Sequence, residues 1–386
     1  MPARRGDRVL RYVAEDGSTG YSVAGGRLVN ALRDRGVEVE MLGVQDGRLD
    51  EPARFVAHSR DQRPLAAPAP EEATTVMHLV PEHLPRVRAS TRGPVVIHTI
   101  WETDELPAHW PHLLNQSDGV LVPTEWNREV FRACGVEVPI EVVPHVACVA
   151  TAPVAPVLDL PEDLIVFYTI SRWDERKVPS LALRAFLEAF TADDPVAFVI
   201  KTGLISEMRQ PDYWGSTSPM YWTSSWDVAR ILRGYPRPPR VLLHVDEWSD
   251  ERIAALHTRG DCYLTLTHGE GWGIGSFDAC AYGNPVIATG WGGHMAYLEG
   301  SPWLVDYDLV AVDNERAIGS YAPSQRWGDP HVDHAVSLLR RVASDLAGAR
   351  AAAQPIGERV ARDYAPRVVA DRLLAALARF GVLDAS

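Results

Sequence analysis

Short apolar runs alternate with segments of helical period along most of the chain. The apolar runs have the length and β-branched composition of buried strands, and the stretches between them repeat apolar residues at helical spacing. In the first part of the chain we expect strands at 8–13, 37–42, 75–80, 94–100, 119–124 and 140–146. Strands that alternate with helices predict βαβ units and a parallel sheet covered by helices.

A proline-rich segment at 152–164 then interrupts the pattern. Proline restricts the backbone and disfavours helix, so this segment is the best candidate for a linker. Beyond it the alternation restarts, with strands expected at 164–170, 196–200, 240–245, 261–267 and 284–289 and a helical tail at about 331–380. The sequence therefore predicts an α/β fold of two doubly wound, Rossmann-like domains. In such sheets, ligands bind outside the carboxyl ends of the strands, which here predicts a cleft between the domains.

Composition and charge narrow the classes of function. The chain has 386 residues and a formal net charge of −13, which argues against a general nucleic-acid binder. No apolar stretch approaches the length of a membrane span, and the first residues lack the apolar core of an export signal, so we expect a cytoplasmic protein. The four cysteines are widely spaced and are interpreted as reduced structural residues: Cys134, Cys148, Cys262 and Cys280.

Candidate chemistry gathers where strands are expected to end. After the strand at 261–267 the chain continues HGEGWGIGSFDACAYG, in which glycines surround Glu270 and a helix is expected to begin. Glycine lets the backbone approach a ligand, and a helix start offers N–H groups to an anion. Asp278 lies about one turn inside that helix. After the first strand, AEDGSTGYSVAGG is also glycine-rich, but a tight turn explains it nearly as well as phosphate binding does.

The third candidate loop is SRWDERKVPS, which follows the first strand of the second domain. It carries Arg172, Arg176 and Lys177. Such a cluster most commonly forms a solvent-exposed basic turn. The alternative is a phosphate clamp, because arginine binds phosphate in a bidentate manner and lysine adds a point charge.

These loops together resemble the retaining GT-B glycosyltransferases of family 4. EGWGIGSFDACAYGNPVIATGWGG matches their paired acidic motif, with aspartate in place of the second glutamate, and SRWDERKVPSLALRAF matches their arginine–lysine pair. PIEVVPHV resembles the end of their N-terminal domain, and the region of Tyr364 resembles their closing helix. The resemblance covers the whole chain and is closest in the C-terminal half. It implies an acceptor domain at 1–150, a donor domain at 151–362 and a helix at 363–386 that packs back on the first domain.

The resemblance also implies a role for each matched residue. Glu270 would bind hydroxyls of the donor sugar, Asp278 would hold the ribose, and Arg172 and Lys177 would neutralise the diphosphate. The backbone of the glycine turn and Gly20 from the other domain would complete the donor site, the turn contributing Gly271, Trp272, Gly273, Ile274 and Gly275. No metal or other cofactor is implied, and we see no metal-ligand spacing. The partners would be a nucleotide sugar, with UDP expected first and GDP next, and an acceptor hydroxyl.

The acceptor side is less specific. Relatives place a histidine after a middle strand, and His98 is the nearest candidate, with Trp101 and Glu102 as alternatives for the same position. A histidine at a strand end is also a common core residue. Glu102 and Asp104 either contact a polar or cationic acceptor or cap a helix expected after Asp104.

An aromatic insertion at 211–232 carries Trp214, Trp222 and Trp226. Such residues stack on sugars, but packing in a core or at a homodimer interface is the favoured interpretation.

The leading hypothesis is a retaining hexosyltransferase whose acceptor is a soluble polyol, an aminocyclitol or a secondary metabolite. Glycan or exopolysaccharide assembly is its main competitor. A GT-B phosphorylase or nucleotide-sugar epimerase would share the architecture. A two-lobed sugar-binding protein is the non-enzymatic alternative, although it would have no use for Arg172 and Lys177 beside an acidic pair.

Overall fold

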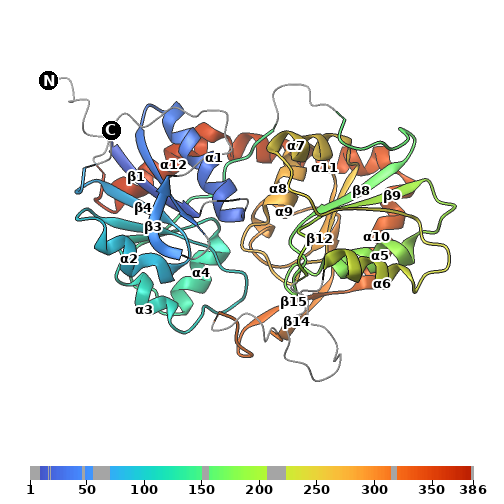
Figure 1. Ribbon diagram of the computed structural model, residues 1–386, viewed down its shortest axis with the longest axis horizontal. Helices are drawn as coiled ribbons and strands as arrows, with labels where there is room; N and C mark the ends of the chain where they lie inside the picture. The colour runs from blue at the N-terminus through green and yellow to red at the C-terminus, as the bar shows by residue number, and fades with distance from the viewer. Residues whose placement is uncertain are drawn as a thin grey trace. The chain divides into compact units, whose positions relative to one another are not determined.

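The computed structural model describes residues 9–15, 17, 19–45, 48–54, 70–149, 156–206, 223–313 and 320–383. For residues 45 and 48–54 it describes the backbone only. The chain divides into two compact units (Figure 1). The N-terminal unit contains Met1–Cys148 and Ala361–Ser386, and the C-terminal unit contains Val149–Val360.

The N-terminal unit is built on a seven-stranded sheet of order β3-β2-β1-β4-β5-β6-β7, in which only β3 runs antiparallel to its neighbour. Its strands are β1 (Val9–Glu15), β2 (Glu38–Gln45), β3 (Arg48–Arg54), β4 (Thr74–His78), β5 (Val95–His98), β6 (Gly119–Val122) and β7 (Ile140–Val142). Its helices are α1 (Gly20–Asp34), η1 (Pro81–His83), α2 (Leu84–Ala89), α3 (Trp110–Leu114), α4 (Glu125–Ala133) and α12 (Pro366–Arg379). Thr19 caps α1, accepting from the Ser22 N–H at 3.3 Å.

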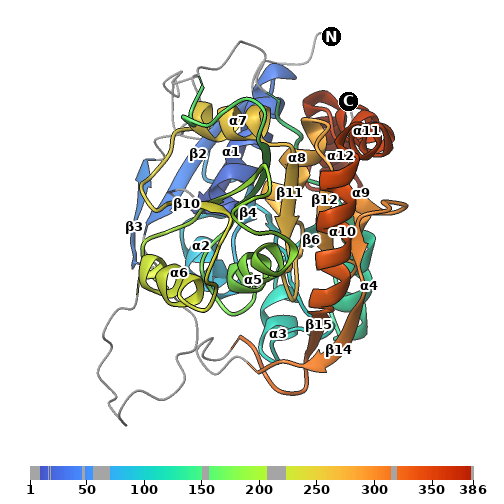
Figure 2. The ribbon, with the colours of Figure 1, turned by 90° about the vertical axis from the view of Figure 1, so that its right-hand side faces the viewer.

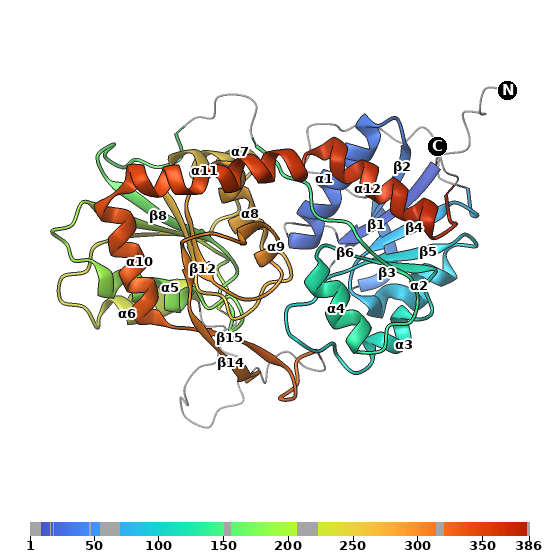
Figure 3. The same ribbon diagram turned by 180° about the vertical axis from the view of Figure 1, so that it is seen from behind.

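The last helix, α12, returns to the N-terminal unit and lies beside α1 (Figure 3). Leu373 and Leu377 of α12 are fully buried in one core with Leu28 and Leu32 of α1. This apolar face explains why the end of the chain belongs to the first unit.

An ion pair also ties α12 to the sheet. Arg379 donates to both carboxylate oxygens of Glu141, at 2.8 and 2.7 Å, with side chains 54% and 26% exposed. We expect Arg379→Ala to lower the free energy of unfolding by less than about 1 kcal/mol, since exposed pairs contribute little. Urea denaturation of the full chain measures it. A loss above about 2 kcal/mol would show that the ion pair, rather than apolar packing, holds the helix.

The C-terminal unit has an all-parallel six-stranded sheet of order β10-β9-β8-β11-β12-β13. Its strands are β8 (Ile165–Ile170), β9 (Val196–Lys201), β10 (Arg240–His244), β11 (Cys262–Thr265), β12 (Val286–Thr289) and β13 (Leu304–Val305). Its helices are α5 (Pro179–Ala189), α6 (Ser224–Leu232), α7 (Asp250–Arg259), α8 (Ile274–Ala281), α9 (Met295–Leu298), α10 (Val332–Ser344) and α11 (Leu346–Asp363), the last of which crosses into the other unit. The two sheets with their helices confirm the predicted doubly wound α/β class.

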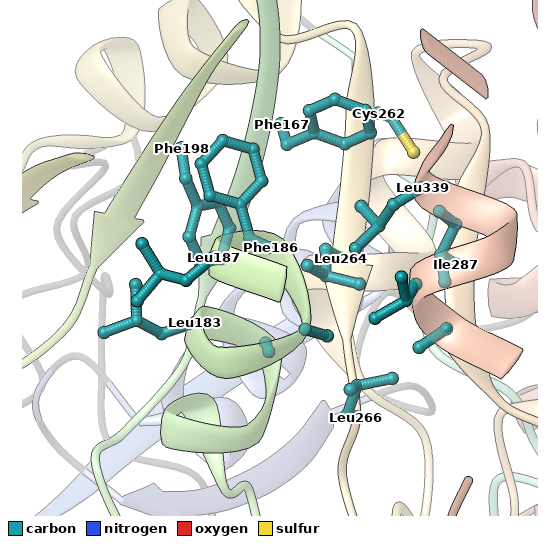
Figure 4. Packing of buried hydrophobic residues seen from close by; sticks show 14 of the residues in the cluster. Phe167, Leu183, Phe186, Leu187, Phe198, Cys262, Leu264, Leu266, Ile287 and Leu339 are labelled. Carbon is teal, nitrogen blue, oxygen red and sulfur yellow. The ribbon is translucent and has the colours of Figure 1, made fainter. Parts of the chain in front are cut away.

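One face of the second sheet is covered by α5 and α10, which lie side by side (Figure 2). Between them and the sheet lies a core of Phe167, Phe186, Phe198, Leu264 and Leu339, all fully buried (Figure 4). Continuous apolar strands such as IVFYTI and VAFVI are typical of sheets covered on both faces.

Three features were not predicted. The first is the antiparallel edge strand β3, and the second is the two-residue strand β13. The third is the antiparallel pair of β14 (Tyr307–Ala311) and β15 (Arg326–Pro330). Within this pair, the Gly328 N–H donates to the carbonyl of His268 at 2.8 Å, which connects it to the loop after β11.

Candidate functional site

Strands β8 and β11 are neighbours at the centre of the second sheet, and the chain runs outward from them in opposite directions. This is the topological switch point, where loops diverge and open doubly wound sheets bind ligands. The loop after β8 carries Arg172 to Lys177, and the loop after β11 carries Glu270. The fold therefore brings two of the predicted motifs, about 90 residues apart in the sequence, to one place.

A buried charge cluster forms where these loops meet. The Lys177 ammonium donates to Oε1 of Glu270, and Nη1 of Arg176 lies 3.6 Å from Oε2. The three side chains are 19%, 8% and 16% exposed, respectively. Two cations surround one carboxylate, so these three side chains carry a net positive charge. Such a surplus beside a buried carboxylate favours an anionic ligand.

The pKa shifts follow from this arrangement. Burial alone would raise the pKa of Glu270, but the charges of Lys177 and Arg176 outweigh it and hold that pKa below its usual value. Burial lowers the pKa of Lys177, and Glu270 opposes this shift. The carboxylate is thus ionised and held as a hydrogen-bond acceptor.

The backbone of the first loop is fixed in an unusual conformation. Oδ1 of Asp174 accepts from the N–H groups of Arg176 and Lys177, at 3.1 and 2.7 Å. The next residue, Val178, has φ 40° and ψ 51°, and no other non-glycine residue in the described part of the chain has positive φ. This conformation costs a β-branched residue on the order of 1–3 kcal/mol. Strain of this kind, directly after Lys177, is a mark of functional loops.

Packing explains part of the glycine pattern. Gly273 has φ 83°, in the left-handed region, and immediately precedes α8. A Cβ on Gly293, in the turn after β12, would lie 1.9 Å from the carbonyl oxygen of Gly271, and the Gly293 N–H donates to the Glu270 carbonyl. These two glycines let the turn and the loop pack on each other and fix the backbone of Glu270.

The start of α8 provides donors next to this turn. No side chain caps the helix, and the first N–H groups of any helix, here those of Ile274 and Gly275, have no acceptor within it. Tyr297 holds the preceding turn in place, its hydroxyl lying 2.7 Å from the Trp272 carbonyl and 2.9 Å from that of Gly273. Together with the cations, this gives the site two kinds of donor for an anion.

The remaining predicted donor residues lie nearby in the chain but differ in exposure. Asp278 is buried within α8. The Trp272 ring is buried against Phe277 and Tyr297, so this residue offers its backbone rather than its ring. Arg172 is 66% exposed and lies 3.3 Å from Asp174. The arginine at Glu270 is Arg176, which the sequence placed in the basic cluster without a role of its own.

His294 was missed by the sequence analysis. It is fully buried, and its Nε2 lies 2.6 Å from the Thr289 carbonyl oxygen. Burial lowers its pKa, while the charge of Glu270 acts in the opposite direction. The feature of the sequence that could have indicated His294 is its position directly after the glycine turn.

The acceptor-side candidates belong to the N-terminal unit, and so does Gly20, which was predicted to complete the donor site. His98 ends β5 and is fully buried, and Gly20 is the first residue of α1. Trp101 is buried, and its indole N–H is directed at Thr103 and Glu105 within its own loop. Glu102 and Asp104 are half-buried.

Of the two alternatives for Asp104, the helix cap does not occur, because His109 is the N-cap of the next helix. The next helix, α3, begins only at Trp110, because two prolines, at 107 and 111, restrict where it can begin. Of the aromatic insertion, Trp214 and Trp222 lie outside the described residues. Trp226 is 36% exposed in α6, with the Arg230 guanidinium 5.4 Å from its ring, so it is not a core residue.

No protein-family model and no curated protein sequence matches the chain. Several solved structures, however, are similar to it. A sucrose-phosphate synthase from Thermosynechococcus elongatus is 15% identical with a TM-score of 0.65, and 96% of this chain covers 98% of that one. The chain has the GT-B fold.

Two other GT-B structures are similar over much of the chain. The Anabaena protein HepE, in complex with UDP and glucose, is 12% identical with a TM-score of 0.60, covering 96% of this chain and 100% of its own. Staphylococcus aureus TarM, with UDP and other ligands, is 13% identical with a TM-score of 0.55. That match covers 79% of this chain and 55% of TarM, so the chain spans little more than half of TarM's length.

None of the helices in the described regions combines the length and the apolar character needed to cross a membrane.

Proposed function

We propose that the chain is a retaining glycosyltransferase that moves a hexose from a nucleoside diphosphate sugar, UDP-linked first, to an acceptor hydroxyl. The observation that carries the proposal is the buried Lys177–Glu270–Arg176 cluster at the switch point, beside the uncapped start of α8. Cations and helix N–H groups at one point suit a diphosphate, and an adjacent ionised carboxylate suits sugar hydroxyls. The GT-B fold, which this chain shares with proteins solved in complex with UDP, supports the same ligand class.

The chemistry follows from where charge develops. As the anomeric bond breaks, negative charge grows on the departing diphosphate oxygen. Lys177, Arg172 and the N–H groups of Ile274 and Gly275 would stabilise that charge more strongly than they stabilise the ground state. No metal ion is needed at the diphosphate in this scheme.

The carboxylates would orient the donor. Glu270, kept ionised by its two cations, would accept from hydroxyls of the sugar, and Asp278 would accept from the ribose. Orientation of this kind contributes to rate by holding the reacting atoms in place. Retention would follow from attack by the acceptor hydroxyl on the face that the diphosphate leaves, with a diphosphate oxygen taking the proton.

The donor proposal is tested first by calorimetric titration of the wild-type protein with UDP, GDP, ADP, UMP and inorganic phosphate. We expect one diphosphate, UDP, to bind best, and UMP to bind at least about tenfold more weakly because it lacks the second phosphate. If no nucleotide binds while inorganic phosphate does, the transferase proposal fails and a phosphorylase takes its place.

For the acceptor we propose a soluble polyol, aminocyclitol or secondary metabolite. The acidic chain, with a net charge of −13, would tolerate a cationic acceptor and is poorly suited to an anionic membrane surface. Transfer from the nucleotide sugar identified above is then assayed on a panel of polyols, aminocyclitols and lipid-linked acceptors. Activity on lipid-linked acceptors alone would reject the soluble acceptor while leaving the donor site intact.

A further inference from the structure

Three histidines from distant parts of the sequence meet in the N-terminal unit. His78 ends β4, His98 ends β5, and His145 follows β7. Each histidine has a ring nitrogen that lies within 4.8 Å of a ring nitrogen of each of the other two. All three side chains are buried. The carboxyl ends of parallel strands collect ligand-binding groups at one edge of a sheet, and these histidines occupy that edge.

The rings are close together and differ in orientation. His78 and His98 stack with centroids 4.1 Å apart and planes 8° from parallel. His145 is tilted, with its centroid 5.6 Å from His78 and 5.7 Å from His98. The lone pairs of an imidazole lie in the plane of its ring, so those of the two stacked rings run side by side, and one ring must rotate before three nitrogens can converge on one ion.

Burial is the main influence on the pKa values of the three rings. It lowers the pKa of His98 to about 4, while a backbone hydrogen bond at Val143 acts in the opposite direction. Burial, together with the other two histidines, lowers the pKa of His78 well below its usual value. Burial, His98 and Arg27 do the same for His145.

The hydrogen bonds of His78 and His98 also favour a binding site. Nδ1 of His78 lies 2.7 Å from the Tyr12 hydroxyl, and when this nitrogen carries the proton, Nε2 is left as a ligand. His98 is fully buried, and its ring makes at most one hydrogen bond, to the Val143 backbone, so at least one ring nitrogen has no partner. A fully buried ring nitrogen without a partner costs stability unless something binds it, and this favours a site over simple packing.

We propose that His78, His98 and His145 form a binding site for a transition metal ion of the zinc type. Imidazole nitrogen suits Zn²⁺ and its neighbours, and a set of three histidines without a carboxylate does not suit Mg²⁺ or Ca²⁺. Zinc–nitrogen bonds of about 2.0–2.1 Å place tetrahedral ligands about 3.3 Å apart, so the widest pair closes by at most about 1.5 Å on binding. The site lies in the unit that does not contain Lys177 and Glu270. Metal binding can therefore be measured separately from donor binding, although His98 is also the candidate for the sugar-side position.

The test uses full-length protein without a histidine tag, dialysed against chelator and then against Co²⁺ or Zn²⁺. We expect one metal per chain by elemental analysis and a visible Co²⁺ spectrum of tetrahedral type. His98→Ala and His145→Ala should each weaken binding at least about tenfold, and Tyr12→Phe about 10- to 100-fold, as loss of an outer hydrogen bond to a ligand does. His112→Ala, at an exposed histidine of α3, is the matched control and should bind like wild type.

Two results would overturn the proposal. One is wild-type protein that binds less than one metal per chain under these conditions. The other is a His98→Ala variant whose affinity equals that of His112→Ala. Tyr12→Phe keeps the buried ring, so it still decides the question if an alanine variant fails to fold.

Discussion

Replacing Lys177 by methionine should lower kcat/KM for sugar transfer by about 10²- to 10³-fold, the loss typical of removing one preorganised group at a developing charge. Methionine keeps much of the stem and removes the ammonium, which is buried against Glu270. Steady-state kinetics with the nucleotide sugar identified by titration measure the effect. Wild-type activity in Lys177→Met would contradict the assigned role.

Lys177→Met also leaves the carboxylate of Glu270 without its closest cation. Glu270 would remain buried with only Arg176 nearby, at 3.6 Å, and breaking a buried pair in this way costs on the order of 3–5 kcal/mol. The double variant Lys177→Met/Glu270→Gln removes both charges, so we expect it to recover most of the stability and none of the activity. This separates a catalytic loss from a folding loss.

A matched control lies at the opposite edge of the same sheet. The buried Asp261, just before β11, pairs with Arg350 as its closest cation and with Arg259 at 3.4 Å. Arg350→Met therefore also removes the closest cation from a buried carboxylate and leaves a second one, but it should leave kcat/KM within about twofold of wild type, since ligands bind at the carboxyl ends of the strands. An equal loss in both variants would mean that activity follows stability alone.

Much of the fold could be predicted because its strands are long apolar runs. β8 and β9 are nearly continuous in apolar residues, and the strands that the sequence indicated occur in two parallel sheets. Strands β3 and β15 were missed for a physical reason. RLDEPAR and RWGDP contain proline and several charged residues, so neither has the apolar run by which a strand is predicted.

The candidate site was predictable only in outline. Chain order placed Lys177 and Glu270 at strand ends, and the sheet order then brought them together. The choice between Arg172 and Arg176 as the neighbour of Glu270 depends on the backbone of the loop, which turns through a left-handed Val178. No propensity favours that conformation for valine, so it could not be predicted.

The contact among the three histidines could not be predicted either, because it joins residues that are far apart in the sequence. His78, His98 and His145 are separated by 20 and 47 residues, and each looks like an ordinary buried histidine in its own strand or loop. Their meeting depends on the order β4-β5-β6-β7 at one edge of the sheet. A search for metal-ligand spacing detects ligands that are close in sequence, and it has no access to sheet order.

Gly293→Ala should abolish nucleotide binding and lower the free energy of unfolding by about 4 kcal/mol or more. The added Cβ would lie 1.9 Å from the Gly271 oxygen, 2.5 Å from its carbonyl carbon and 3.0 Å from the Glu270 oxygen. All three are backbone atoms, so no side chain can rotate away, and the loop that carries Glu270 must move. A displacement of about 1 Å at such a loop is enough to cost two orders of magnitude in rate.

The matched control for this change is Gly26→Ala, in the interior of α1. A Cβ there meets no atom within 4 Å, so alanine should stabilise the helix by about 0.5–1 kcal/mol. Calorimetric titration with UDP and urea denaturation of both variants give the comparison. If Gly293→Ala binds UDP like wild type, the turn after β12 does not fix the Glu270 loop, and the glycines of this segment serve only the packing of the C-terminal unit.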